Sequence, residues 1–117
     1  MARILIADSD LSFRKALILL LSHKMGIREV CEAADIGALI QTVLENPPDL
    51  LLLGWSLYGT SGSATCQLLR KSHPSLKIIL LSVNPDDAAE ANAAGAAFLR
   101  KGAPAEEILA TLKSLIG

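Results

Sequence analysis

Three side chains that could do chemistry together stand directly after three apolar runs of this 117-residue sequence. Asp8 follows RILIA, Ser82 follows KIILL, and Lys101 follows AAFLR. A carboxylate, a hydroxyl and an ammonium group that met in one cleft could bind a metal ion, a phosphate or each other. Taken alone, each has an ordinary structural explanation as a loop polar group or a surface charge. Only a shared position in the fold would support a functional interpretation.

Two neighbouring features bear on this picture. Ser9 and Asp10 follow Asp8, and either could cap a helix that begins at residue 11, which is the favoured role for Asp10. A further apolar run, DLLLL at residues 49–53, ends in Gly54, a residue with no side chain. Gly54 therefore supplies neither a nucleophile nor a ligand at a place where the other runs end in polar groups.

The elements that must position these residues alternate along the whole chain. Apolar runs rich in β-formers predict strands at residues 3–7, 28–33, 49–53, 77–81 and 96–100. Apolar spacing, caps and breaks predict helices at residues 11–24, 35–45, 63–72, 86–94 and from 104 to the C-terminus. Strands that alternate with helices through short connections imply a parallel sheet covered on both faces. Ligands of such sheets bind outside the carboxyl ends of the strands, where the polar residues stand.

Finer features of these elements are also predicted. The strand at 28–33 has charged flanks and is expected at an edge of the sheet. Gly26 and Gly95 are expected to end the first and fourth helices. The segment 55–62, with Tyr58 and Gly59, is expected to form a loop before the third helix.

Composition sets outer bounds on the function. The length fits one domain, 1–117, and the hydrophobic fraction of 51% is enough to fill one core. A net charge of −1 argues against a nucleic-acid surface, which needs a clustered basic footprint. Cys31 and Cys66 lack metal-ligand spacing and are expected to be reduced, buried thiols. No signal peptide or membrane span is recognisable, so we expect a soluble cytoplasmic domain.

On these residues the chain resembles a receiver domain, the CheY-like phosphoacceptor module of two-component response regulators, over residues 3 to about 116. ILIADSDLSFRKAL is similar to the family's first strand, acidic pair and first helix. PDLLLLGWSLYGTSG is similar to its third strand and active-site loop. KIILLSV carries the hydroxyl position in Ser82, and GAAFLRKGAPAEEIL carries the aromatic Phe98, Lys101 and the last helix. The resemblance implies an α/β, flavodoxin-like (βα)5 three-layer sandwich with a parallel five-stranded sheet of order 2-1-3-4-5.

The sequence departs from the family at the centre of the site. The resemblance places the phosphoacceptor aspartate at Gly54 and the second member of the acidic pair at Ser9. The family's metal ligands would be these two carboxylates and the backbone carbonyl of Ser56, so two of the three are missing. Magnesium demands near-ideal oxygen geometry and dehydrates reluctantly, so we expect its binding to be weak or absent. No other cofactor, no metal site and no catalytic residue is expected.

The remaining parts of the site lead to two hypotheses. Asp8 faces Lys101 with no other carboxylate at the matched positions, so we expect an ion pair, direct or through water, in place of the metal site. Asp10 could turn inward and compete for Lys101. Ser82 and Phe98 match the family's switch hydroxyl and switch aromatic. An inward Phe98 is favoured by burial, and an ordinary core role is an equal alternative.

The most favoured function is a degenerate receiver domain, not an enzyme, that acts by phosphorylation-independent protein–protein contact. The resemblance is to receivers of transcription factors with a C-terminal helix-turn-helix domain. One alternative is an ordinary phosphorylatable receiver disabled by an engineered change at Gly54, against which Ser9 argues. Another is a small ligand-binding or enzymatic domain of the same fold, although neither a nucleophile nor a phosphate-binding glycine loop follows the first strand.

Two surfaces are candidates for a protein partner or a homodimer. The helix at 11–24 contains ALILLL, which is apolar all round, so Ile18 and Leu19 should face outward. The resemblance indicates the face made by the helix at 86–94, the strand at 96–100 and the last helix. Acids on this face are also explained by helix N-termini, which favour negative charge: Asp86, Asp87, Glu90, Glu106 and Glu107. No nucleic acid and no membrane is expected as a partner of this domain.

Overall fold

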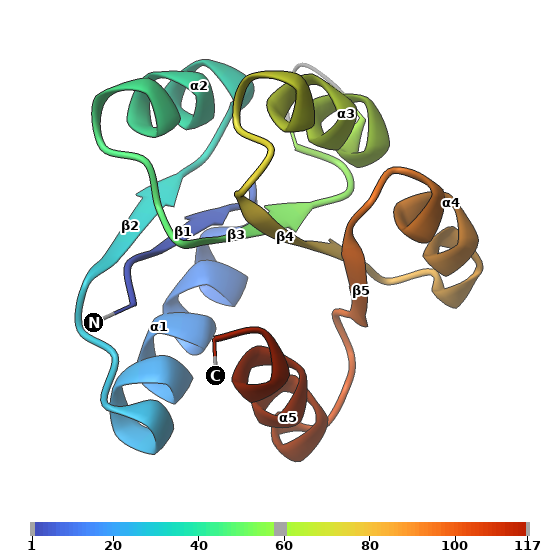
Figure 1. The fold of residues 1–117 in the computed structure, drawn as a ribbon. Helices are drawn as coiled ribbons and strands as arrows, with labels where there is room; N and C mark the ends of the chain where they lie inside the picture. The colour runs from blue at the N-terminus through green and yellow to red at the C-terminus, as the bar shows by residue number, and fades with distance from the viewer. Residues whose placement is uncertain (1, 58–60, 117) are drawn as a thin grey trace.

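A five-stranded parallel sheet lies at the centre of the computed structural model, which describes residues 2–57 and 61–116 (Figure 1). The strands are β1 (Ile4–Ala7), β2 (Val30–Ala33), β3 (Leu50–Gly54), β4 (Lys77–Ser82) and β5 (Ala97–Arg100). Their order is β2-β1-β3-β4-β5, as the resemblance implied, and β2 is an edge strand as its charged flanks predicted. From β1 the chain first moves outward to β2, and it then crosses over β1 to reach β3. The direction of strand addition therefore reverses between β1 and β3.

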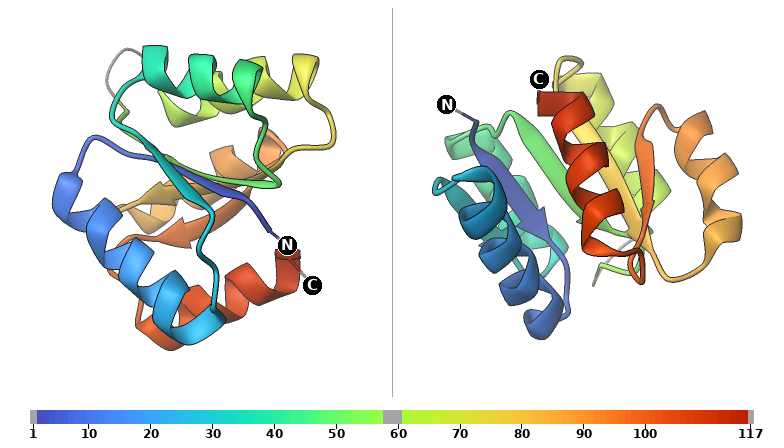
Figure 2. Two further views of the ribbon diagram at one scale, coloured as in Figure 1. Left: turned by 90° about the vertical axis from the view of Figure 1, so that its left-hand side faces the viewer. Right: turned by 90° about the horizontal axis from the view of Figure 1, so that it is seen from below.

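Helices cover both faces of the sheet and confirm the three-layer arrangement (Figures 1 and 2). On one face lie α1 (Leu11–Met25) and α5 (Ala105–Ile116), and on the other lie α2 (Ile36–Glu45), α3 (Gly62–Ser72) and α4 (Ala88–Ala93). Alternate residues of the central strands fill the two cores: Leu51 and Leu53 point to the α2–α3 side, and Leu50 and Leu52 to the α1–α5 side. The continuous leucine run of β3 is thus explained by burial on both faces.

The helix ends follow local chemistry. Gly26 and Gly95 have φ values of +65° and +84°, a region in which glycine is favoured, and they follow α1 and α4 as predicted. The fourth helix begins later than residue 86, because a 3₁₀ turn (Pro85–Asp87), capped by the Asn84 side chain, precedes it. Gly62 was predicted in a loop but begins α3, since Ser61 caps that helix. Tyr58 and Gly59 lie outside the described residues.

The outward face of α1 differs in one residue from the prediction. Leu19 is 58% exposed, as expected. Ile18 is only half-buried and packs against the α1–α5 core, so its predicted outward position was wrong. The buried stripe of α1 runs through Arg14, Leu17 and Leu21, and Ile18 flanks this stripe closely enough to share the core.

Within the described residues, no helix combines the length and the apolar character that crossing a membrane would require.

Candidate functional site

The carboxyl ends of β1, β3 and β4 bring most of the predicted site residues together. A cavity of about 100 Å³ opens there, lined by Asp8, Ser9, Trp55, Ser56, Leu81, Ser82, Val83 and Lys101. Residue 54 lies beside it, at the last position of β3, where it pairs with Leu81 of β4. Asp8, Ser82 and Lys101 therefore lie together in the fold, which was the condition for a functional interpretation of these residues.

Asp8 is the buried anion of this site. Its side chain is 3% exposed, and Oδ2 lies 2.8 Å from Nζ of Lys101, whose side chain is 21% exposed. Its other oxygen, Oδ1, accepts a hydrogen bond of 2.8 Å from the backbone N–H of Asp10. The predicted ion pair is thus confirmed in its direct form. Both carboxylate oxygens are engaged by groups of this chain.

Lys101 is held in place by its backbone as well as by Asp8. Its N–H donates to the carbonyl oxygen of Ser82 at 2.8 Å, which joins the first residue after β5 to the end of β4. Its Nζ also lies 4.5 Å from the centroid of the Phe13 ring, close enough for a cation–π interaction. Asp10 does not compete for this ammonium group. It is exposed and caps α1 by accepting a hydrogen bond of 3.2 Å from the N–H of Phe13.

Gly54 is the reason that the Asp8 carboxylate can lie where it does. A Cβ atom placed on residue 54 would stand 2.5 Å from Oδ2 and 3.0 Å from Cγ of Asp8. Both distances are too short for non-bonded atoms, so Asp8 occupies space that a side chain at position 54 would need. The backbone of Gly54 itself is not in the left-handed region. The absence of a side chain at position 54 therefore allows the Asp8 carboxylate to approach the backbone closely.

Ser82 is engaged by a carboxylate that the sequence had not connected with it. Its hydroxyl donates to Oδ2 of Asp87 at 2.6 Å and accepts from the N–H of Asn84 at 3.1 Å. The Ser82 side chain is buried, and Asp87 is half-buried at the end of the 3₁₀ turn before α4. These bonds hold the connection between β4 and α4 against the end of the sheet. A hydroxyl followed five residues later by an acid was the only sequence signal for this contact.

A second group that sequence reasoning missed lies on the other side of β1. Arg14 is buried and donates to the backbone carbonyl of Asp8 at 2.6 Å and to Oε1 of Glu32 at 3.0 Å. Lys15 donates to the other oxygen of Glu32 at 2.9 Å. A signal existed, because Arg14 stands on the apolar stripe of α1 with Leu17, and a buried charge needs a partner.

Two pKa values are shifted by these surroundings. The hydrogen bond from Lys15 lowers the pKa of the Glu32 carboxyl, and the one from Arg14 lowers it further, while burial acts in the opposite direction. Burial raises the pKa of the Cys66 thiol, which lies within the α2–α3 core. Cys66 is buried as predicted, whereas Cys31 is half-buried, and both are free thiols.

Known proteins resemble this chain over nearly its whole length. A sequence model of the response regulator receiver domain matches residues 4–113. The chain belongs to this family. It is 29% identical over 119 residues to the oxygen regulatory protein NreC of Staphylococcus haemolyticus, a match that covers 97% of this chain and 54% of that protein. It is 28% identical over 118 residues to the response regulator UvrY of Escherichia coli K12, with 98% and 54% covered.

Solved structures agree with this assignment. The signal receiver domain of NarL from Mycobacterium tuberculosis superposes with a TM-score of 0.85 at 27% identity, over 99% of this chain and 97% of that one. The receiver domain described here spans about half the length of the curated relatives that it matches. Receiver domains are in general signalling domains rather than enzymes; they contact other proteins and often form dimers.

The residues present do not fit the metal ion that the family would imply. Asp8 is the one carboxylate beside the cavity at the matched positions, and both of its oxygens are engaged. Ser9 and Gly54 bring no carboxylate. Across the described ranges 2–57 and 61–116, no three His, Cys, Asp or Glu side chains are grouped so that they could hold a metal ion. The Lys101 ammonium stands where a cation would balance Asp8, and no magnesium chemistry follows from this donor set.

Phe98, the predicted switch aromatic, lies on β5, shortly before Lys101 in sequence. It does not line the cavity that contains Asp8 and Lys101. It is half-buried and packs against the α2–α3 core. This position is compatible with both interpretations of Phe98, so its role as a switch stays a prediction.

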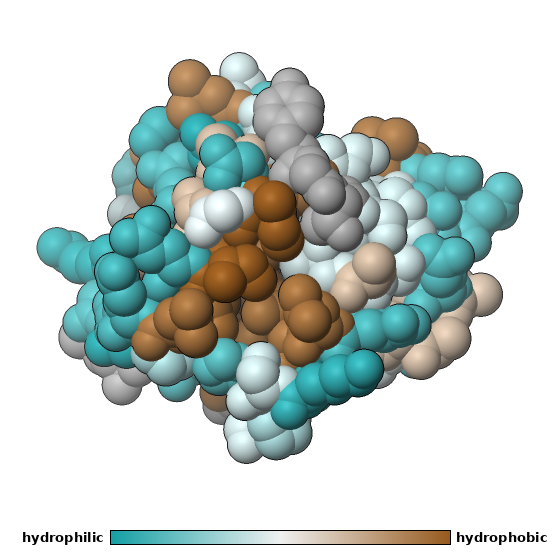
Figure 3. Space-filling view, turned by 90° about the horizontal axis from the view of Figure 1, so that it is seen from above, coloured by the Kyte–Doolittle hydropathy of each residue, from teal (hydrophilic) through white to brown (hydrophobic). Residues whose placement is uncertain are grey.

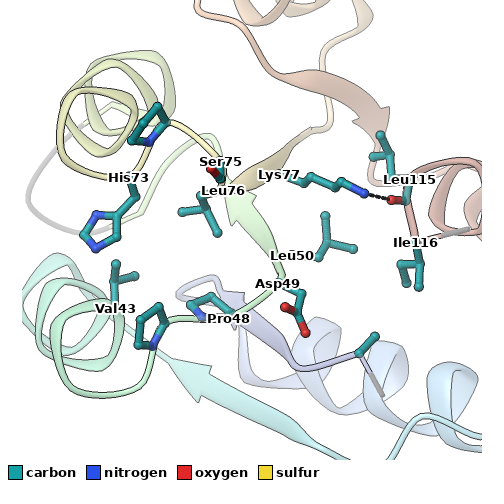
Figure 4. Close-up of a pocket in the computed structure, with 13 residues that line it drawn as sticks. Val43, Pro48, Asp49, Leu50, His73, Ser75, Leu76, Lys77, Leu115 and Ile116 are labelled. Carbon is teal, nitrogen blue, oxygen red and sulfur yellow. Dashed lines mark hydrogen bonds between the residues drawn. The ribbon is translucent and has the colours of Figure 1, made fainter.

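A larger cavity, of about 870 Å³, lies at the opposite end of the strands, beside the starts of β3 and β4 (Figure 4). Apolar residues make most of its lining, among them Val43, Leu50, Leu76 and Ile116. Lys77 crosses its rim and donates to the carbonyl oxygen of Leu115 at 2.5 Å, which ties the start of β4 to the end of α5. None of the predicted site residues lines this cavity.

Proposed function

We propose that this receiver domain signals without a phosphoryl group at position 54, by contact with another protein. One observation carries the proposal: the Asp8 carboxylate, paired with Lys101 at 2.8 Å, fills the space beside Gly54 in which an acceptor side chain would stand. The pair neutralises both charges within the cavity. The site therefore has neither the nucleophile for phosphoryl transfer nor the excess negative charge that attracts a divalent cation.

The engagement of Ser82 supports the same proposal. In the family this hydroxyl position reaches for the phosphoryl group, and here the hydroxyl already donates to Asp87 at 2.6 Å. An internal carboxylate thus supplies the acceptor that a phosphoryl oxygen would otherwise provide. The connection between β4 and α4 is held without any modification of the chain, so an input must come from a partner that binds one conformation better than another.

The mass of the intact chain tests the proposal. The protein is incubated with a small-molecule phosphodonor and magnesium, beside a receiver that has aspartate at the matching position as a positive control. We expect the control to gain an acid-labile phosphate and this chain to remain unmodified. An acid-labile phosphate on the parent chain would overturn the proposal.

Restoring the missing carboxylates adds a second arm to this test. Gly54→Asp alone should restore little phosphorylation, because the new side chain meets Asp8 and one metal ligand is still absent at Ser9. Ser9→Asp together with Gly54→Asp should restore more. Full, metal-dependent phosphorylation of the single variant would instead support an engineered loss at position 54.

We also propose that magnesium binds weakly or not at all. Trp55 is the one tryptophan of the sequence and lines the cavity beside Asp8, so its fluorescence reports directly on the site. Titration with millimolar magnesium should produce no saturable change. A saturable change that Asp8→Asn abolishes would contradict this part of the proposal.

The domain is further proposed to belong to a response regulator that controls transcription through a C-terminal helix-turn-helix domain. Support comes from the similarity to NreC and UvrY, each of which this chain matches over 54% of its length. The reading frame that encodes the chain decides this point. A helix-turn-helix encoded after residue 117 would support the assignment, and a different effector or a stop codon would exclude it.

A further inference from the structure

The outer face of the α2–α3 layer carries an apolar patch that the site does not use. Figure 3 shows hydrophobic side chains gathered near the middle of this face, with hydrophilic ones around them. Leu44 of α2 is 69% exposed and Leu68 of α3 is 57% exposed. Ile36 and Ile40 of α2 are half-buried and pack against the α2–α3 core. We call these four residues the α2–α3 patch.

Helix geometry places the members of the patch along one groove. Ile36, Ile40 and Leu44 recur at steps of four residues and so form a stripe along one side of α2. On α3, Ser63 turns toward α4, because its hydroxyl donates to Glu90 at 2.8 Å. Leu68 lies roughly 140° around the helix from Ser63 and therefore faces α2.

The same geometry fixes the direction of the α2 stripe. Both helices lead into parallel strands, so α2 and α3 run in the same direction. Leu44 lies on the same side of α2, relative to the face that packs on the sheet, as Ser63 does on α3. Since that side of α3 faces α4, the corresponding side of α2 faces α3. Near the ends of α2 and α3, Val43 and His73 line the larger cavity (Figure 4).

Charge at the two helix ends is complementary to a second copy of the same surface. Glu45 is exposed at the end of α2, and Lys71 is exposed near the end of α3. These ends lie at one level, since the strands that follow them begin with the paired residues Leu50 and Lys77. A two-fold axis along the groove lays α2 of one copy on α3 of the other. Each Glu45 then meets the Lys71 of its partner, while the patches cover each other.

We propose that the α2–α3 face is a homodimer interface, built from the apolar patch and two symmetric Glu45–Lys71 ion pairs. An interface built from four apolar residues and two exposed ion pairs fits a weak, concentration-dependent association rather than an obligate dimer. It is distinct from both surfaces predicted from the sequence, which lie on α1 and on the α4–β5–α5 face. The proposal stands on this surface alone and does not depend on the chemistry at Gly54.

Sedimentation velocity over a wide concentration range, up to about millimolar, tests the interface. We expect the parent chain to form dimers as its concentration rises. Leu68→Asp and Leu44→Asp should each weaken the dimer by roughly tenfold or more, because they bury a charge in the apolar centre. Leu19→Asp is the matched control: Leu19 is 58% exposed on α1, on the other face of the sheet, and the variant should dimerise like the parent.

Charge reversal separates this pairing from nonspecific apolar association. Glu45→Lys should weaken the dimer by roughly two- to fivefold, and adding Lys71→Glu should restore it. Circular dichroism confirms that each variant is folded. A parent that stays monomeric, a dimer that Leu19→Asp disrupts and Leu68→Asp does not, or a double reversal that fails to restore affinity would each overturn the proposal. None of these outcomes changes the phosphodonor experiment, so the two proposals fail separately.

Discussion

Substitution of Gly54 by alanine tests the packing on which the site depends. The added Cβ would stand 2.5 Å from Oδ2 of Asp8, so the carboxylate must move. Asp8 has little freedom to do so, because its side chain is 3% exposed and is held by Lys101 and by the N–H of Asp10, each at 2.8 Å. Overpacking of this kind costs about 1–3 kcal/mol. Loss of a hydrogen bond to a charged group costs about 1.5–3 kcal/mol if the carboxylate turns away.

Part of this cost is offset by the alanine itself. Replacing glycine where the backbone is compatible stabilises a protein by about 0.4–1 kcal/mol, because the unfolded chain loses freedom. Gly54 is not in the left-handed region, so this gain applies. We expect Gly54→Ala to lower the free energy of unfolding by about 1–3 kcal/mol in total.

A double-mutant cycle identifies Asp8 as the cause. In an Asp8→Ala background the obstructing carboxylate is absent, and Gly54→Ala should be neutral or stabilising by up to about 1 kcal/mol. The coupling between the two substitutions should therefore be about 1–4 kcal/mol, above the scatter expected for independent sites. Denaturant unfolding followed by circular dichroism measures all four corners of the cycle.

The chain contains a matched control for this experiment. At Gly37 in α2, an added Cβ would meet only Oδ1 of Asp35 at 3.5 Å, an ordinary contact. Gly37→Ala should stabilise the domain by about 0.5–1 kcal/mol, since alanine is the better helix former. Equal costs for Gly54→Ala with and without Asp8, or no cost in the parent, would refute the account of the site.

Three further substitutions and reactions test neighbouring parts of the structure. Ser82→Ala removes the hydrogen bond to Asp87 and should destabilise the domain by about 1–2 kcal/mol, with faster amide exchange over residues 83–95; unchanged exchange there would contradict the role of this bond. The pKa of Glu32 is lowered in the fold, so its stabilisation is complete above its ordinary value of 4.5 and is lost as the pH falls below it. The melting temperatures of the parent and of Glu32→Gln should therefore converge in acid, and a constant gap would argue against it. Burial raises the pKa of Cys66, so iodoacetamide should alkylate it far more slowly than Cys31 in the native protein, whereas equal rates would show that the core around Cys66 opens readily.

Much of the fold was predictable because local and tertiary signals agree. The run LLLLG is buried at every position of β3, and Gly26, with a φ of +65°, ends α1 where the helical spacing of apolar residues stops. The less accurate boundary, at the start of α4, lies where Pro85 and the Asn84 side chain stabilise a 3₁₀ turn before the alanine-rich helix. Alanines contribute little to fixing such a boundary, since they bury little area.

The site was predictable where it depends on topology and not where it depends on rotamers. Parallel strands bring Asp8 and Lys101 to one edge, and the absence of a second carboxylate leaves them to pair. The acceptor of the Ser82 hydroxyl depends on how the 3₁₀ turn places Asp87, which no spacing rule specifies. The position of Ile18 was also not predictable from the sequence. Where every residue of a stretch of α1 is apolar, the pattern does not indicate which residue flanks the buried stripe.

A crystal structure of the chain grown in millimolar magnesium tests the central claim most directly. The account predicts Oδ2 of Asp8 within ion-pair distance of Nζ of Lys101, beside Gly54, with the Ser82 hydroxyl on Asp87. A magnesium ion coordinated by Asp8, with Lys101 turned away from it, would contradict the account.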